Sequence, residues 1–149
     1  MDIIEYFSSK NKEHWLSKIG ESDWNAGKFL YKLLKNGELK SATGENTKVL
    51  LLTEGEELIS FCTFADKDDI QPTELTPWIG FVFTFPKQRG HRHAGKLLAH
   101  AEKLAKESGF GNIYISTNHI GLYEKYGYEF FRMMKDIDGE NSRVYTKQL

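Results

Sequence analysis

The most regular pattern of apolar and polar positions lies in the second half of the chain, where a strand-like run precedes a helix-like run. Trp78 to Phe85 is mostly aromatic or β-branched, and Pro86 ends this run because proline has no N–H to donate to a neighbouring strand. From about His93 to Ser108, alanine and leucine recur at steps of three and four residues, which predicts one apolar helix face. We therefore expect a strand, a tight loop and a helix.

The same patterns give the first half of the chain a short strand, two helices and a strand hairpin. Asp23 stands where the second helix should begin and is the expected N-cap. The short acidic segment Glu54–Glu57 joins two strand-like runs closely enough for a hairpin. The expected elements are a strand at 3–7, helices at 12–19 and 24–34, a polar loop at 41–47, and strands at 49–53, 58–65 and about 76–84.

Shorter elements follow the long helix, which Gly109 should end. A strand is expected at 112–117, a short helix at about 120–125, and two strands at 128–134 and 142–147 around the hairpin signal Asp138-Gly139. On the long helix, Glu102 and Lys106 are spaced as a surface ion pair. The order of elements predicts an α/β (α+β) fold with a mixed, mostly antiparallel sheet flanked by helices.

Length and charge narrow the class of protein. With 149 residues, the chain is expected to form one domain over residues 1–149, and its net charge of −1 argues against a general nucleic-acid binder. No run is long and apolar enough to span a bilayer and no signal-peptide core is present, so we expect a cytoplasmic protein without a membrane partner. The single cysteine, Cys62, cannot form an intramolecular disulfide.

The loop between the strand and the long helix gathers positive charge and contains no acidic residue. Gly90 and Gly95 permit close backbone turns, and free N–H groups at a helix start favour anions. These features predict a phosphate site, and the alternative is a solvated basic turn. The basic and histidine side chains of the loop are Lys87, Arg89, His91, Arg92, His93 and Lys96.

A nucleotide-binding P-loop is one interpretation of this loop. Gly90–Leu97 spells G-x-x-x-x-G-K-L, whereas the P-loop ends in a serine or threonine that ligates magnesium. Leu97 has no oxygen to offer and fits the apolar face of the helix. A nucleotide hydrolase is therefore the weaker alternative.

Two segments of the chain fit another pair of motifs more closely than the P-loop pattern. Arg89-Gly90-His91-Arg92-His93-Ala94 resembles [QR]-x-x-G-x-[GA], the pyrophosphate loop of the GNAT superfamily of N-acetyltransferases, with Arg92 where the family usually has glycine. Gly121 to Tyr128 resembles the segment L-Y-x-x-x-G-[FY], about thirty residues downstream. The motifs cover residues 78–128, and the order of elements agrees over nearly the whole chain.

The resemblance implies acetyl-CoA as cosubstrate, bound where two central strands splay apart. Those strands would be Trp78–Thr84 and Asn112–Thr117, and main-chain groups of the first would pair with the pantetheine arm. Asn118 would either cap the following helix or contact the coenzyme. The cofactor-binding residues implied are Val82, Phe83, Thr84, Arg89, Gly90, His91, Arg92, His93, Ala94, Gly95, Lys96 and Asn118.

The resemblance also implies a mechanism, in which a primary amine of a small molecule or protein attacks the thioester directly through a tetrahedral intermediate. A backbone N–H of Phe83 or Thr84 would stabilise the oxyanion, and Tyr123 would protonate the departing thiolate. Glu74 is the first candidate for the base that deprotonates the amine, followed by Asp69 and Asp66.

Other functional classes remain open at this point. A non-catalytic acyl-CoA-binding module would keep the loop but would not need Tyr123. GNAT proteins are often dimers, so the resemblance leaves a homodimer open. We expect no metal site, because the histidines at 91, 93, 100 and 119 lack cysteines or a supporting carboxylate pattern.

Overall fold

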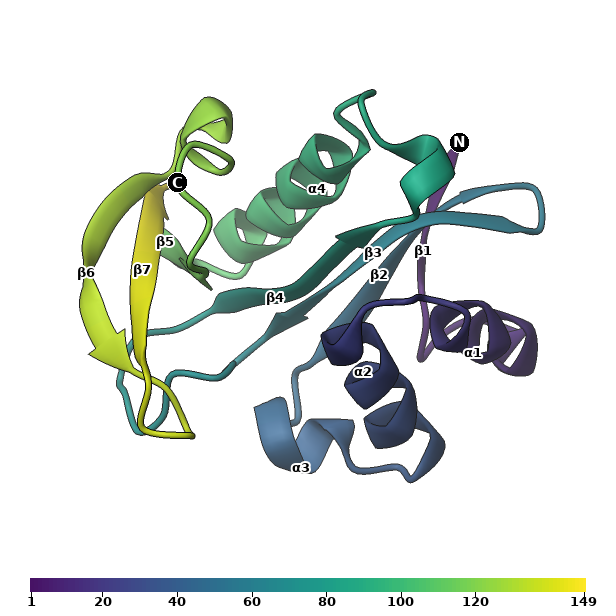
Figure 1. The fold of residues 1–149 in the computed structure, drawn as a ribbon, viewed down its shortest axis with the longest axis horizontal. Coiled ribbons are helices and arrows are strands. Elements are labelled where there is room, and N and C mark those ends of the chain that lie inside the picture. The colour runs from purple at the N-terminus through teal and green to yellow at the C-terminus, as the bar shows by residue number, and fades with distance from the viewer.

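A computed structural model describes residues 1–149 and contains one seven-stranded sheet with helices on both faces (Figure 1). The strand order is β1-β2-β3-β4-β5-β7-β6, and only β4 and β5 run parallel. This confirms the predicted fold class. The elements are β1 (Asp2–Glu5), α1 (Lys12–Gly20), α2 (Asn25–Lys35), α3 (Leu39–Thr43), β2 (Lys48–Glu54), β3 (Glu57–Ala65), β4 (Trp78–Thr84), η1 (Pro86–Gln88), α4 (His93–Glu107), β5 (Asn112–Ser116), η2 (Glu124–Tyr126), β6 (Glu129–Lys135) and β7 (Asn141–Gln148).

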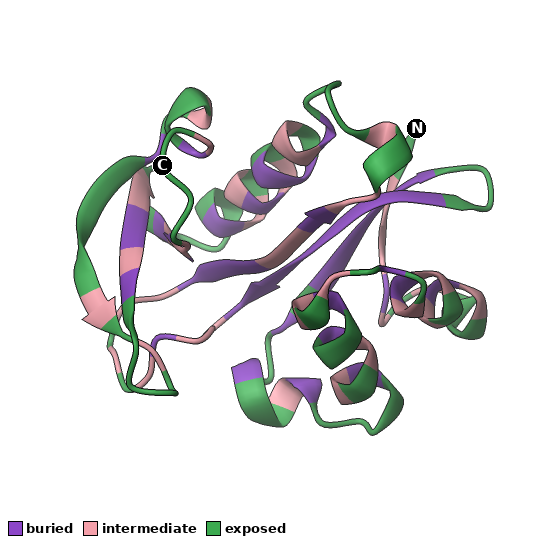
Figure 2. Ribbon diagram, in the orientation of Figure 1, coloured by how far each residue is buried: buried purple, intermediate pink, exposed green.

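The central strands are buried because helices cover both faces of the sheet (Figure 2). Successive strand residues point to opposite faces, so Leu50 and Leu52 of β2 pack in the cluster formed with α4, whereas Val49 and Leu51 pack with α1 and α2. Burial on both faces explains why the strands are almost continuously apolar. No helix combines the length and the apolar content of a membrane span.

Three local predictions of secondary structure were wrong. The expected polar loop at 41–47 begins inside α3, where the Thr43 hydroxyl donates to the Leu39 carbonyl over 2.9 Å and both residues are buried. Asp23 does not cap α2, because Trp24 takes the N-cap position and no side chain caps the helix. The helix expected at 120–125 is only the 3₁₀ turn η2.

The sheet opens between β4 and β5. These strands pair only at Trp78 with Tyr114 and at Ile79 with Ile115, after which they separate. On the other side of β4, the register shifts so that two residues stand opposite Cys62, which is the signature of a β-bulge. Phe81 lies in this bulge with φ of 51°, a backbone conformation that non-glycine residues rarely adopt. The bulge turns β4 away from β5 and leaves one edge of its C-terminal half unpaired, which confirms the predicted splay.

Candidate active site

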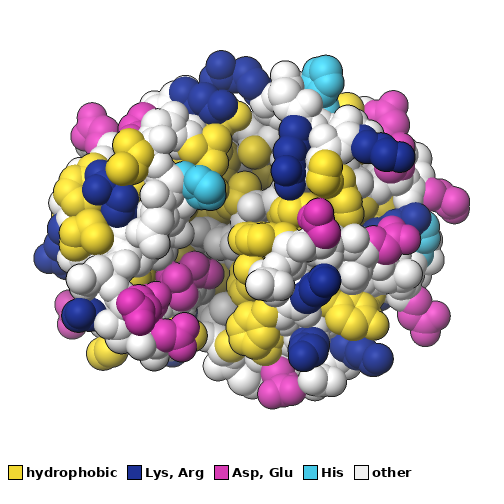
Figure 3. Space-filling model, viewed as in Figure 1, with side chains coloured by type: hydrophobic (Ala, Val, Ile, Leu, Met, Phe, Trp, Pro, Cys, Tyr) yellow, Lys and Arg dark blue, Asp and Glu magenta, His cyan; other side chains and the backbone are white.

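A cavity of about 1160 Å³ lies where β4 leaves β5, and the space-filling view shows it as a central hollow (Figure 3). Its lining includes Phe29 and Leu33 of α2, on one face of the sheet, and His93 and Ala94 of α4, on the other face. The cavity therefore runs through the opening between the two strands. Residues 79–84 of β4 form one of its walls.

Basic side chains and the start of α4 surround one end of the cavity. Gly90 has φ of 88°, and Arg92, at the N-cap position of α4, has φ of 58°. The loop therefore needs the left-handed conformation at the position where the GNAT pattern usually has glycine. The Arg92 guanidinium carbon lies 5.2 Å from the centroid of the Tyr126 ring, and Arg89 Nε donates to the Thr84 carbonyl over 2.9 Å. Because α4 has 15 residues, its free N–H groups and dipole favour negative charge at this end of the cavity.

Gly95 and His93 lie in the first turn of α4, where Gly95 packs against Tyr126 and His93 lines the cavity. A Cβ at Gly95 would lie 2.7 Å from Tyr126 Cε1, so the absence of a side chain lets the tyrosine ring rest on the helix. The His93 ring is buried and lines the cavity, and its Nδ1 has no hydrogen-bond partner. Burial lowers the pKa of His93, and the nearby charges of Lys96 and His91 lower it further, so the ring is neutral at pH 7.

Carboxylates line the opposite part of the cavity, and Figure 3 shows them at the lower left of the hollow. Asp68 and Asp69 follow β3, and Asp136 and Asp138 belong to the β6–β7 turn. The Ile137 N–H donates to the Asp69 carbonyl over 2.8 Å, which joins the two segments. None of the three ion pairs of the structure includes a cavity aspartate. No lysine or arginine of the protein therefore lies within ion-pair distance of these carboxylates.

Asp68 holds an unusual position and has an unusual pKa. Its carboxylate lies against the Cα of Gly80, where any Cβ would overlap with it. Burial raises the pKa of Asp68 to about 8, and the charge of Asp69 contributes to the rise. Burial also raises the pKa of Asp69, and Asp136 adds to that shift. Because the two groups interact, the pair retains a proton at a higher pH than isolated carboxylates would.

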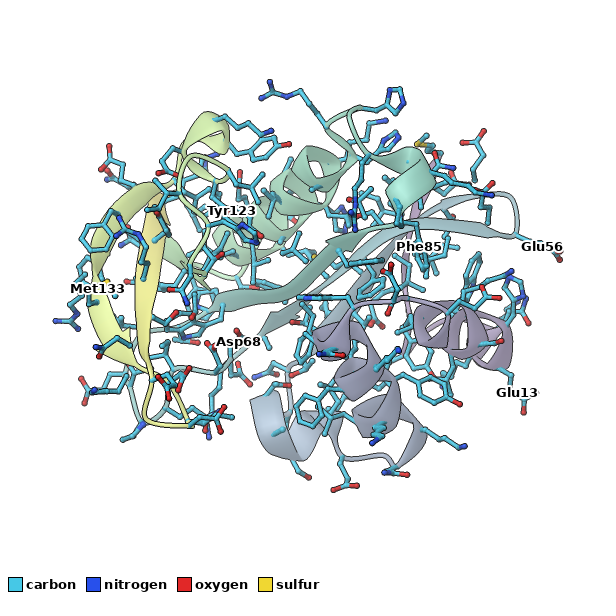
Figure 4. The ribbon with its side chains drawn as sticks, viewed as in Figure 1. Glu13, Glu56, Asp68, Phe85, Tyr123 and Met133 are labelled. Carbon is cyan, nitrogen blue, oxygen red and sulfur yellow. The ribbon has the colours of Figure 1, made fainter.

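Tyr123 lines the cavity immediately before η2. Its ring is 6% exposed and packs edge-on against Tyr128, with 6.3 Å between the ring centroids. Burial raises the pKa of the Tyr123 hydroxyl far above its usual value. Tyr123 and Asp68 lie above and below β4 in Figure 4. The cavity thus brings together a protonated phenol, a carboxyl pair of raised pKa and a helix start that favours negative charge.

A protein-family model described as the acetyltransferase (GNAT) family matches residues 8–128, which include both the basic loop and the Tyr123 segment. The chain belongs to the GNAT family. This membership makes the protein an acetyltransferase, and it confirms the family that the two sequence motifs indicated.

Solved structures show the same fold at low sequence identity to this GNAT chain. The aminoglycoside 6'-N-acetyltransferase from Enterococcus faecium is 12% identical, with a TM-score of 0.70 over 99% of this chain and 97% of that one. An aminoglycoside 6'-N-acetyltransferase complexed with coenzyme A has 13% identity, a TM-score of 0.69 and the same coverage. An acetyltransferase from Streptococcus agalactiae has 20% identity and a TM-score of 0.64, covering 99% of this chain and 98% of that one. No curated sequence is significantly similar to this chain.

In the structure, most of the residues expected to bind the cofactor lie along the cavity. The exceptions lie close to it: His91 and Lys96 are exposed, Gly95 supports Tyr126, and Asn118 Oδ1 accepts the Arg143 N–H over 3.4 Å. Asn118 therefore does not cap a helix. The expected residues that line the cavity are Val82, Phe83, Thr84, Arg89, Gly90, Arg92, His93 and Ala94.

The candidates for the base are placed very differently from one another. Glu74 is exposed and does not line the cavity, and Asp66 lies outside the lining with its carboxylate bonded to Asn46. Of the three expected residues only Asp69 faces the cavity. Asp68 was missed by sequence reasoning, although Gly80 within an apolar strand was a signal that another group approaches closely there.

Proposed function

We propose that this GNAT protein transfers an acetyl group from acetyl-CoA to a primary amine of a small cationic molecule. One observation carries the proposal: a single cavity follows the unpaired edge of β4 from an anion site at α4 to a cluster of unpaired carboxylates. The donor would occupy the anion-binding end and the acceptor the acidic end.

Main-chain groups of β4 support the placement of the donor. Residues Val82 to Thr84 lie beyond the last pair with β5, so their edge is free to pair with the extended pantetheine arm. The Phe83 carbonyl already accepts the Ser60 hydroxyl over 2.6 Å, which anchors the bulge to β3. The pyrophosphate would rest on the N–H groups at the start of α4, beside Arg89 and Arg92. Coenzyme A is bound in one of the structurally similar aminoglycoside acetyltransferases, which supports the same donor here.

The chemistry proceeds by direct attack. Ionised Asp68 takes one proton from the substrate ammonium, and the neutral amine nitrogen then attacks the thioester carbon and forms the C–N bond. The nitrogen loses its second proton to solvent as the intermediate collapses. A backbone N–H of Phe83 or Thr84, positioned by the bulge, stabilises the tetrahedral oxyanion. The C–S bond then breaks, and the thiolate takes the proton of the Tyr123 hydroxyl. The raised pKa of Asp68 makes its ionised form a stronger base for the ammonium proton, and the raised pKa of Tyr123 keeps its hydroxyl protonated, so that it can donate to the thiolate as the C–S bond breaks.

The acidic end indicates what kind of acceptor fits. The cavity aspartates have no basic partner in the protein, so an ammonium group on the substrate would balance their charge. Opposite them, Trp24, Phe29 and Leu33 of α2 offer an apolar wall, and the Phe29 side chain is 51% exposed. We therefore propose a small molecule with more than one ammonium group, one reacting and another bound. The aminoglycoside acetyltransferases among the similar structures act on acceptors of this chemical type.

Titration calorimetry with acetyl-CoA and, separately, with magnesium ATP tests the donor, and a panel of mono- and polyamines then tests the acceptor. Micromolar acetyl-CoA binding, no response to ATP and turnover that favours polyamines are expected. Binding without turnover on any amine would favour the acyl-CoA-binding module. No response to acetyl-CoA would contradict the proposal, and an ATP response would favour the nucleotide-binding alternative.

Replacing Arg92 separates its charge from its backbone conformation. Arg92→Ala and Arg92→Gly both lose the guanidinium, so each should raise the Kd for acetyl-CoA by about 5- to 20-fold at low salt. Only glycine adopts the left-handed conformation without a steric cost. The free energy of unfolding of Arg92→Gly should therefore be about 1 kcal/mol higher than that of Arg92→Ala. Calorimetry at two salt concentrations and thermal unfolding measure the two effects.

Lys87 is exposed and lies outside the cavity lining, so Lys87→Ala is the matched control. An unchanged Kd in both Arg92 variants would remove Arg92 from the anion site.

A further inference from the structure

We infer that Glu102, Lys147 and Tyr128 form a polar clamp that positions Tyr123 for proton transfer. The clamp lies outside the cavity, so its members are positioning residues and touch no substrate. The inference rests on the proposed role of Tyr123 as the acid. Glu102 was expected to pair with Lys106 on the surface of α4, and the structure contradicts that expectation.

One carboxylate joins three parts of the fold. Glu102 Oε2 accepts the Tyr128 hydroxyl over 2.8 Å, and Glu102 Oε1 accepts Lys147 Nζ over 2.9 Å. Lys147, from β7, also donates to the Tyr126 carbonyl over 2.9 Å. The side chains of Glu102 and Lys147 are 16% and 30% exposed, so solvent screens this pair less than a surface pair. The clamp therefore ties α4 and β7 to the segment that follows Tyr123.

The clamped segment holds Tyr123 through the backbone. The N–H groups of Tyr126 and Tyr128 both donate to the Tyr123 carbonyl, over 3.0 and 3.2 Å. The intervening η2 is a single 3₁₀ turn of three residues, a structure with little stability of its own. The backbone position of Tyr123 consequently depends on the contacts of Tyr126 and Tyr128 with the rest of the fold, in addition to the packing of its own ring in the core. The clamp adds polar contacts to this segment through side chains that do not line the cavity.

A partly buried ion pair with a tyrosine partner is better suited to fixing the geometry of a segment than to raising the stability of the fold. A partly buried ion pair gives little net stability, because removing both charges from water costs about as much as their attraction returns. It does impose geometry, since each Glu102 oxygen has its own donor and Lys147 has two acceptors. Burial and the Glu102 charge raise the pKa of Tyr128, so its hydroxyl remains a donor.

A double-mutant cycle tests the clamp, with Glu102→Gln, Tyr123→Phe and the combined variant. Glu102→Gln should lower kcat by about 10-fold and leave the KM for acetyl-CoA within about twofold, because the cavity lining is unchanged. In the Tyr123→Phe background the same change should have no further effect on kcat. Tyr128→Phe removes one bond without unpairing a charge and should act like Glu102→Gln. Glu107→Gln, an exposed position on the same helix without a bonded partner, is the control.

Hydrogen exchange separates failure of the clamp from failure of the proposed function. Glu102→Gln should speed exchange at the amides of Tyr126 and Tyr128 by about 10-fold without affecting β5. Unchanged exchange, or an equal loss of kcat with and without the Tyr123 hydroxyl, would overturn the clamp. If Tyr123→Phe keeps full activity while Glu102→Gln speeds exchange, the proposed role of Tyr123 fails and the tether itself stands.

Discussion

Replacing Tyr123 by phenylalanine is expected to lower kcat by about 10²-fold or more while the affinity for acetyl-CoA stays within about twofold. The ring fills the same space against Tyr128, so packing is preserved and only the hydroxyl is lost. Without a proton donor the thiolate must leave unprotonated, which raises the barrier of the second half of the reaction. Steady-state rates and calorimetry on the same preparation measure the two quantities.

Tyr114→Phe is the matched control, because Tyr114 lies on β5, outside the cavity lining, and its hydroxyl has no hydrogen-bond partner within the protein. Its kcat should equal that of the parent protein. Full activity in Tyr123→Phe would show that thiolate departure needs no help from this residue, and the acid would then have to be sought among other cavity groups or solvent.

Asp68→Asn is expected to lower kcat/KM for the amine by about 10²- to 10³-fold at pH 7. An alkyl ammonium has a pKa of about 10.4, so at neutral pH the amine needs a base, and the amide of asparagine cannot accept its proton. The loss should shrink as the pH rises towards 10, where the amine deprotonates without help. The parent protein should lose kcat/KM as the pH falls below about 8, the pKa to which burial raises Asp68. Rate profiles of both proteins from pH 6 to 10 test this.

Two further variants sharpen the assignment of the base. Gly80→Ala keeps the carboxylate but places a methyl group where it lies, so activity should fall in the same pH-dependent way. Glu74→Gln examines the residue that the sequence favoured. A loss of activity in Glu74→Gln but not in Asp68→Asn would return the role of base to Glu74.

Asp68 also makes the stability of the protein depend on pH. The free energy of unfolding should fall as the pH rises, whereas kcat/KM should rise. The folded protein keeps the Asp68 proton up to about pH 8, whereas an unfolded aspartate loses it near pH 4. Between these values the folded state binds more protons, so the free energy of unfolding falls as the pH rises. Asp68→Asn abolishes this fall and should be more stable than the parent at pH 8, by about 1–3 kcal/mol. Thermal unfolding at pH 5 and pH 8 measures the difference.

Most of the fold could be predicted because its elements have strong, local patterns. The run from Trp78 to Phe85 and the leucine and alanine stripe of α4 each have one plausible structure, and their order excluded most other sheets. The errors lie in short segments that tertiary contacts decide. The five-residue α3 is too short to show a period, and it forms because Leu39 and Thr43 find buried positions.

The candidate site was predictable where it depends on the backbone and less so where it depends on loops. Arg89, Gly90 and the residues of β4 line the cavity because they belong to a continuous strand, loop and helix. The orientation of Asp68 depends on a loop that has no periodic pattern and on a contact with Gly80 distant in sequence. The clamp around Glu102 was unpredictable for the same reason, since Lys147 lies 45 residues away.

Because β4 separates from β5, one edge of β4 lacks a neighbouring strand. A ligand that pairs with this edge therefore contributes to the free energy of unfolding. A molecule that pairs with the free edge of β4 binds only the folded chain, because the unfolded chain has no such edge. Saturation at 100 times the Kd would then add about 2.7 kcal/mol to the free energy of unfolding, as much as many core side chains contribute. The thermal stability of the protein is consequently a property of the chain together with whatever occupies the gap.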